Sequence, residues 1–123
     1  MKYLELAKQV ALLSDKPQRI GAVLVDKGRV VSVSCNLSKS HPVQARLNKL
    51  RFIDDKCLNH IHAETACLLL YKGKLKKPEL YIYRVKNDGK VGMSKPCKAC
   101  QELIRQYGIT KVYFTTEQSI EKL

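Results

Sequence analysis

The spacing of hydrophobic and polar positions predicts three helices along this chain. Residues 1–13 carry apolar side chains at the spacing of one helix face, and the polar segment 14–17, which ends in proline, terminates that helix. Residues 62–71 are rich in alanine and leucine and form a second predicted helix, and residues 97–107 form a third. A glycine follows closely after each of these two segments, as is common just beyond a helix C-terminus.

Short apolar runs bounded by turn residues predict strands between these helices. The predicted strands are residues 20–25, 30–35, 80–85 and 111–115. The first two are joined by the turn Asp26-Lys27-Gly28 and form a predicted hairpin. Residues 116–123 resemble a helical turn, so the pattern shows no clear fifth strand. A hairpin followed by helix–strand–helix–strand predicts a mixed sheet with helices on its faces.

Composition narrows the class of protein. The 123 residues are 45% hydrophobic and 28% charged, without repeats or linkers, so we expect a single domain over residues 1–123. Glu5 and Lys8 interrupt the N-terminal segment, which does not resemble a secretory signal, and no apolar run approaches the roughly 20 residues of a membrane span. We therefore expect an intracellular, cytoplasmic protein with no membrane partner. Five cysteines, an odd number, then favour metal binding or buried thiols over disulfides.

The formal net charge of +12 is large for a chain of this size. Lysine and arginine crowd the segment 72–98, where Glu79 and Asp88 are the only acids. Such an imbalance favours phosphate-bearing partners, because binding them releases counterions. A solvated lysine-rich surface without a ligand is the alternative interpretation.

Two short motifs carry the chemistry of the chain, and each opens a predicted helix. The first is His62-Ala63-Glu64 and the second is Pro96-Cys97-Lys98-Ala99-Cys100. The two cysteines are one helical turn apart, so both sulfurs can converge on one metal, and a helix N-terminus favours their thiolate forms. One histidine and two cysteines form a three-ligand zinc set whose fourth position is open for water, as in catalytic zinc sites. Glu64, two residues after the histidine, is then placed as a proton shuttle.

The two motifs together resemble the zinc-dependent cytidine/deoxycytidylate deaminase-like superfamily. The resemblance covers nearly the whole order of elements. It implies a three-layer α-β-α cytidine deaminase-like fold, with a mixed sheet of four to five strands and the zinc-ligand helices on one face. It also implies Zn²⁺ as the cofactor.

The same resemblance assigns roles to individual residues. It implies that His62, Cys97 and Cys100 are the zinc ligands and that Glu64 is the catalytic acid and base. Asn36, just after the second strand, resembles the family asparagine that contacts the substrate sugar. Ala63 and Ser94 lie where family members hold the base with main-chain groups.

Other histidines and cysteines have less specific surroundings. His60 is interpreted as a loop-lining imidazole, with substrate contact as the alternative, and His41 lies in the same long basic connection, residues 36–60. Cys35, Cys57 and Cys67 have no ligand-like spacing, so we expect them to be inert or buried.

The sequence leaves the carrier of the target base open. The basic charge favours cytosine in single-stranded DNA or RNA, and the segment 93–97 resembles the polynucleotide-editing cytosine deaminases, which implies the same carrier. The abundance of small deaminases favours a free cytidine nucleotide. Two departures from deoxycytidylate deaminases, Thr65-Ala66 after Glu64 and Leu37-Ser38-Lys39 after Asn36, weaken the nucleotide hypothesis. Lys95, where tRNA adenosine deaminases have glutamate, weakens the alternative of adenine-to-hypoxanthine conversion in tRNA.

Two further hypotheses concern catalysis and assembly. A non-catalytic zinc-containing nucleic-acid-binding module is the alternative from another class, but such a module has no use for Glu64. A homodimer is a further hypothesis, because the missing fifth strand exposes a sheet edge that a second copy can cover.

Overall fold

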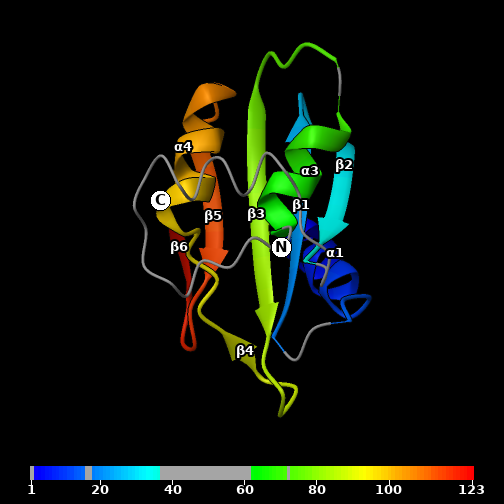
Figure 1. Ribbon diagram of the computed structural model, residues 1–123, viewed down its shortest axis with the longest axis vertical. Helices are drawn as coiled ribbons and strands as arrows, with labels where there is room; N and C mark the ends of the chain where they lie inside the picture. Colours follow the sequence, from blue (N-terminus) through cyan, green and yellow to red (C-terminus); the bar gives the residue numbers. More distant parts are fainter. Residues whose placement is uncertain (1, 16–17, 37–61, 72) are drawn as a thin grey trace.

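The computed structural model describes residues 2–15, 18–36, 62–71 and 73–123. The elements, in chain order, are α1 (Lys2–Ala11), β1 (Arg19–Asp26), β2 (Arg29–Cys35), α3 (Ala63–Leu70), β3 (Pro78–Val85), β4 (Val91–Gly92), α4 (Lys98–Gln106), β5 (Lys111–Thr115) and β6 (Ile120–Lys122) (Figure 1). All three predicted helices and all four predicted strands are confirmed, with boundaries that differ by a few residues.

The strands form one mixed sheet in the order β2-β1-β3-β5-β6, and β4 pairs with β3 outside this path. The β3–β5 pair is parallel, and α4 lies on the connection between these two strands. The β1–β2, β1–β3, β3–β4 and β5–β6 pairs are antiparallel. The predicted hairpin and mixed sheet are therefore confirmed.

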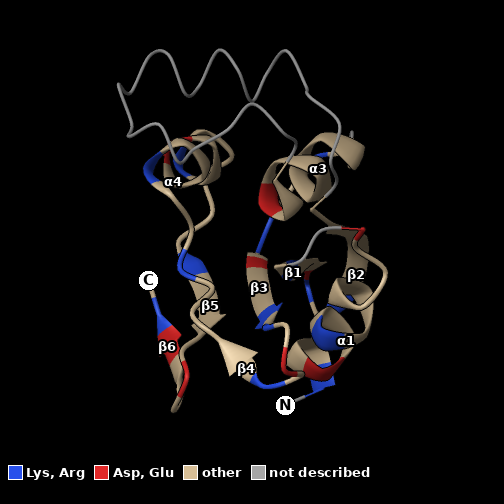
Figure 2. Cartoon of the chain, turned by 60° about the horizontal axis from the view of Figure 1, so that its bottom comes forward, with Lys and Arg blue, Asp and Glu red and all other residues tan. Residues whose placement is uncertain are grey.

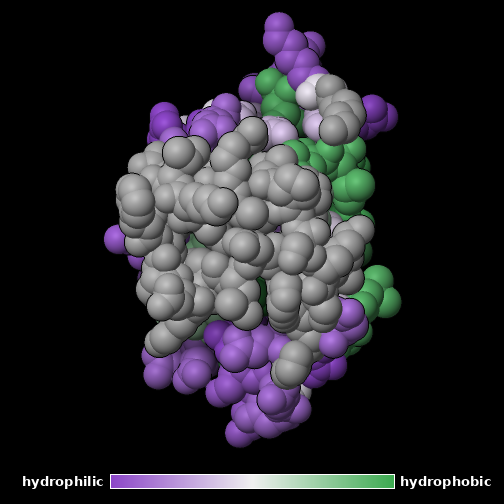
Figure 3. Space-filling model, viewed as in Figure 1, coloured by the Kyte–Doolittle hydropathy of each residue, from purple (hydrophilic) through white to green (hydrophobic). Residues whose placement is uncertain are grey.

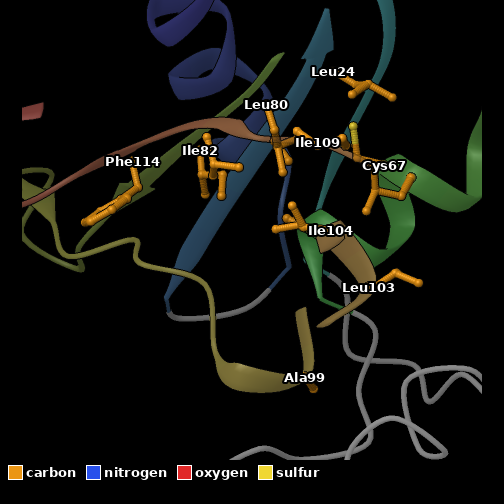
Figure 4. Packing of buried hydrophobic residues seen from close by; sticks show 13 residues of the cluster. Leu24, Cys67, Leu80, Ile82, Ala99, Leu103, Ile104, Ile109 and Phe114 are labelled. Atoms are coloured by element: carbon orange, nitrogen blue, oxygen red, sulfur yellow. The ribbon is translucent and has the colours of Figure 1, made fainter. Parts of the chain in front are cut away.

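Alternation of side chains along the strands builds two hydrophobic layers. Ala22, Leu24, Leu80 and Ile82 face α3 and α4 and pack there in one buried cluster (Figure 4). The intervening residues, Val23, Val25 and Tyr81, face α1 on the opposite side of the sheet. Figure 2 shows the resulting three layers, with α3 and α4 on one side of the strands and α1 on the other. The predicted α-β-α architecture is confirmed, including the placement of both motif-bearing helices on one face.

The contact between α1 and β1 depends on a glycine. A Cβ atom at Gly21 would lie 2.1 Å from the carbonyl oxygen of Ala7 and 2.6 Å from the backbone nitrogen of Ala11. The helix backbone therefore lies directly against the strand at this position, and no side chain fits between them.

The C-terminal segment differs from its prediction. The expected helical turn over residues 116–123 is wrong, because β6 pairs antiparallel with β5, with Tyr113 opposite Lys122 and Thr115 opposite Ile120. The Thr116 hydroxyl accepts hydrogen bonds from the backbone nitrogens of Gln118 and Ser119, at 3.2 and 2.9 Å, and so closes the turn between the strands. The strand β6 therefore occupies the position beside β5 that was expected to be empty, and this removes the reason for expecting a second copy to pair there.

A second short strand also escaped the sequence pattern. In β4, Gly92 and Val91 pair with Arg84 and Val85 of β3 across a turn at 86–90. This hairpin projects from the end of the sheet at which β3 finishes (Figure 1).

Among the residues that the structure describes, no helix is both long enough and apolar enough to cross a membrane.

Candidate metal centre

The N-termini of α3 and α4 bring three metal-ligating side chains together. His62 immediately precedes α3 with an extended backbone (φ −83°, ψ 155°), and Cys97 holds the same position before α4 (φ −67°, ψ 168°). Cys100 lies one turn into α4. The three ligand atoms all lie within 4.8 Å of one another. His62 Nδ1 is 3.2 Å from the Cys100 sulfur and 3.5 Å from the Cys97 sulfur.

These separations suit a zinc ion. Zinc–nitrogen and zinc–sulfur bonds of about 2.0 and 2.3 Å at tetrahedral angles separate the two ligand atoms by about 3.5 Å. The donor set, one imidazole nitrogen and two sulfurs, is also the kind that zinc prefers. The residues present therefore fit the metal, and three protein ligands leave the fourth position of a tetrahedron open.

The two thiols have opposite electrostatic environments. A hydrogen bond from Cys100, helped by His62 and opposed by burial, lowers the pKa of Cys97 to about 4. The shared hydrogen bond and complete burial raise the pKa of Cys100 well above its ordinary value. Cys97 is therefore the more acidic sulfur of the metal-free pair. Because zinc binds thiolates, metal binding releases whatever protons the two sulfurs still carry.

Glu64 lies in the first turn of α3 and is only 5% exposed. Burial raises the pKa of its carboxyl group, and the charge of His62 opposes this shift. The side chains of His62, Cys97 and Cys100 all act on the pKa of this carboxyl group, which places Glu64 beside the ligand set. A buried carboxyl group in this position is suited to receiving and returning a proton.

Ser94 fixes the segment that leads into α4. Its hydroxyl donates to the carbonyl of Ile82 at 3.0 Å and accepts from the backbone nitrogen of Thr115 at 2.7 Å. Its own backbone nitrogen donates to the Thr115 carbonyl at 2.8 Å. Ser94 therefore ties the approach to Cys97 to the ends of β3 and β5. One main-chain group of Ser94, its N–H, is thus engaged within the protein, and contact of Ser94 with the base remains a prediction.

Asn36 follows β2 and binds the start of β1. Its side-chain oxygen accepts from the backbone nitrogen of Ile20 at 2.9 Å, and its amide nitrogen donates to the Gln18 carbonyl at 2.8 Å. The residue is 7% exposed. The structure therefore gives Asn36 contacts that hold two strands in place, and contact with a sugar remains a prediction. Ala63 is the first residue of α3 and is fully buried between His62 and Glu64.

The remaining candidates fall into two groups, those outside the described residues and two described cysteines. His60, His41 and Cys57 lie outside the described residues. Cys67 is buried, with burial raising the pKa of its thiol to about 11, and burial also raises the pKa of Cys35.

The aromatic residues of β3 and β5 divide between the two faces of the sheet. Tyr81 stacks on Tyr113 on the α1 side, whereas Phe114 packs on the metal side. Tyr81 is thus a packing residue of the layer opposite the candidate metal centre.

Sequence reasoning missed two neighbours of the centre. Thr65 has its hydroxyl 3.6 Å from the Cys100 sulfur, and Thr115 carries the contacts to Ser94. The only indication of Thr65 in the sequence is that it directly follows the motif His62-Ala63-Glu64. Thr115 becomes visible only once β5 is placed beside β3.

Comparisons with known proteins agree with this geometry. The family model for the cytidine and deoxycytidylate deaminase zinc-binding region matches residues 1–116. A comparison with curated proteins found no match. Among solved structures, cytidine deaminase from Burkholderia pseudomallei is similar with a TM-score of 0.65 and 17% identity, over 99% of this chain and 89% of that one.

A phage enzyme has the same fold. The dCMP deaminase from cyanophage S-TIM5 in apo form has a TM-score of 0.63 and 20% identity, over 94% of this chain and 80% of that one. Its structure in complex with dCMP and dUMP has a TM-score of 0.55 and 20% identity, over 92% and 75%. At these identities the likeness establishes the fold.

Fold, metal-ligating cluster and family match together define a zinc-dependent hydrolase, a deaminase of the cytidine type. The chain belongs to the cytidine and deoxycytidylate deaminase family, and the match covers its zinc-binding region.

Proposed function

We propose that this protein converts cytosine to uracil, with release of ammonia, in a phosphate-bearing cytidine. The carrier is a free (deoxy)cytidine nucleotide or a residue of single-stranded nucleic acid. The observation that carries the proposal is the buried carboxyl group of Glu64 beside His62, Cys97 and Cys100. A purely structural zinc site has no use for such a group, which argues against a non-catalytic binding module.

The reaction consumes one water and exchanges the exocyclic amine of the base for an oxygen. Zinc held by His62, Cys97 and Cys100 would lower the pKa of a water in the open position towards about 7. Glu64 accepts the proton of the attacking water and delivers it to the ring nitrogen N3. The carboxyl group then carries the second proton to the departing amine, which leaves as ammonia. Burial of Glu64 supports this role, because a raised pKa brings the carboxyl group closer to the working pH.

Two observations bear on the carrier. The S-TIM5 enzyme of the same fold was solved with dCMP and dUMP, which supports a nucleotide. The net charge of +12 supports a polynucleotide, because a strand offers several phosphates where a mononucleotide offers one. Both carriers present phosphate beside the target cytidine, and this shared chemistry is what we propose the protein recognises.

A side-by-side assay of the zinc-loaded protein tests the proposal. The substrates are dCMP, deoxycytidine, and cytosine-containing single-stranded DNA and RNA at moderate salt, with uracil formation as the readout. We expect dCMP or an oligonucleotide to be deaminated at least tenfold more efficiently, in kcat/KM, than deoxycytidine. If no cytosine substrate is deaminated but adenine in a tRNA stem-loop is converted to hypoxanthine, the target base is adenine and the proposal of cytosine is wrong.

A further inference from the structure

Arg84 lies on the metal side of the sheet, at the end of β3. Side chains alternate along a strand, so Arg84 shares a face with Leu80 and Ile82, which pack under α3 and α4. Its partner on β1 is Ile20, the same residue whose backbone nitrogen donates to the Asn36 side chain. Ser94 binds the carbonyl of Ile82, two residues or about 6.6 Å before Arg84 along the strand. Arg84 therefore lies next to the segment that positions the candidate metal centre.

The fold makes room for the stem of this side chain. Opposite Arg84 on β4 stands Gly92, and a Cβ atom there would lie 3.1 Å from Arg84 Cδ and 2.8 Å from Lys86 Cγ. The absent side chain lets both stems lie across the short strand. Arg84 Nη1 donates to the carbonyl of Met93 at 3.2 Å, which holds the guanidinium group against the segment leading to Cys97.

The guanidinium group has donor capacity left over. Arg84 Nε is buried and has no hydrogen-bond partner among the residues described. An N–H donor without an acceptor is costly, and the guanidinium group also has Nη donors beyond the one that binds Met93, so a small anion beside it would supply the acceptors that the described protein contacts do not. Arginine also presents donors in a planar fork that matches two oxygens of a phosphate group.

A pocket opens beside this group. It has a volume of about 240 Å³ and is lined by Gln18, Arg84, Lys86, Asn87 and Asp88. The other charges are already partly compensated: Lys86 pairs with Glu117 at 3.3 Å, and Asp88 accepts from the backbone nitrogen of Lys90 at 3.0 Å. Figure 3 shows hydrophilic side chains gathered at this end of the molecule. Arg84 is thus the cation in the pocket without an acidic side-chain partner among the described contacts.

We propose that Arg84 binds the phosphate group adjacent to the target cytidine, in the pocket formed with Gln18 and Asn87. The inference rests on the proposed function, since it assigns the phosphate part of that substrate. It makes Arg84 the residue by which the protein prefers a nucleotide, free or within a strand, over a nucleoside.

The test compares substrates with and without phosphate in matched variants. KM is measured for dCMP, for a cytosine-containing oligonucleotide and for deoxycytidine, with deoxycytidine used as a competitive inhibitor where its turnover is too slow. Arg84→Gln is expected to raise KM for the phosphate-bearing substrate about 10- to 100-fold, the loss of a hydrogen-bonded charge pair. The KM or inhibition constant for deoxycytidine should change less than about twofold, because Arg84 is not expected to contact a substrate without phosphate.

Two further variants complete the design. Arg84→Lys keeps the charge and the stem over Gly92 but loses the fork, so it should show a smaller rise confined to phosphate-bearing substrates. Arg105→Gln is the matched control, because Arg105 is an exposed guanidinium on α4 paired with Glu102, and no constant should change. A rise for dCMP alone assigns the phosphate of a free nucleotide, and a rise for the oligonucleotide alone assigns a phosphodiester.

The inference and the proposed function fail in different ways. If the wild-type protein deaminates cytosine and the Arg84 variants change all substrates equally or none, the assignment of Arg84 is wrong while the function stands. If the wild-type protein deaminates no cytosine substrate, the proposed function is wrong and the assignment falls with it.

Discussion

Replacing Glu64 by alanine is expected to lower kcat for cytosine deamination by about 10²- to 10⁴-fold, the usual contribution of a positioned acid–base group. Glu64 is buried beside the ligand set but supplies none of its three ligand atoms. The variant should therefore still bind one zinc ion per chain. The measurement is uracil formation by chromatography together with zinc content by elemental analysis.

The control for this substitution is an acid elsewhere on the same pair of helices. Glu102 on α4 pairs with the exposed Arg105 and supplies none of the three ligand atoms, so Glu102→Ala should leave kcat and zinc content unchanged. Glu64→Gln keeps the shape of the side chain without its proton chemistry and should lose activity as fully as alanine does. Loss of zinc in either Glu64 variant would show instead that the carboxyl group supports the metal rather than the proton transfer.

Replacing Gly21 by alanine is expected to destabilise the protein more than alanine at any other described glycine. The new Cβ atom would lie 2.1 Å from the Ala7 carbonyl oxygen, and both this atom and the Ala11 nitrogen belong to the helix backbone. A backbone cannot rotate aside, so α1 must move off β1 and part of the layer containing Leu4 and Val23 must open. Overpacking of this kind costs about 2–3 kcal/mol of unfolding free energy.

Thermal unfolding followed by circular dichroism measures this effect, with an expected fall of roughly 10 °C in the midpoint. Gly73→Ala is the matched control, because its Cβ atom would meet only the ring of Tyr71, a side chain that can swing away. We expect the control to lose much less stability. Equal midpoints for the two variants would contradict the close contact between α1 and β1.

The sequence predicted the parts of this fold that carry a clear local pattern. The helix at 98–106 has apolar positions at helical spacing, and the strands around Leu24 and Ile82 are apolar runs bounded by turn residues, so local pattern was enough. The strands β4 and β6 have two and three residues, which is too short for any period. They exist because β3 and β5 offer partners at their edges, and that information is not local.

The candidate metal centre was predictable for a different reason. His62 and Glu64 are neighbours in sequence, and Cys97 and Cys100 are one turn apart, so each half is a local motif. The contacts that fix the strands and segments around the two halves are long-range. The bond between Ser94 and Thr115 spans 21 residues, and Asn36 reaches back to Ile20 across 16. These contacts depend on strand register, which the sequence pattern does not specify.

Arg84 illustrates the same limit. In the sequence it is one basic residue in a basic segment, and charge alone gave no reason to single it out. Three features of the structure single out Arg84: its position on the side of β3 that faces α3 and α4, the glycine opposite it on β4, and its buried Nε without a hydrogen-bond partner among the described residues.

The most direct test of the central claim is a zinc titration of the metal-free protein with cytosine deamination as the readout. Stepwise addition of zinc, with dCMP and a cytosine-containing oligonucleotide as substrates, should raise the rate of uracil formation linearly and stop at one zinc ion per chain. Ammonia should be released in equal amount. Binding of one zinc ion per chain without uracil formation from either substrate would contradict the account, because the metal centre would then serve structure and not catalysis of cytosine deamination.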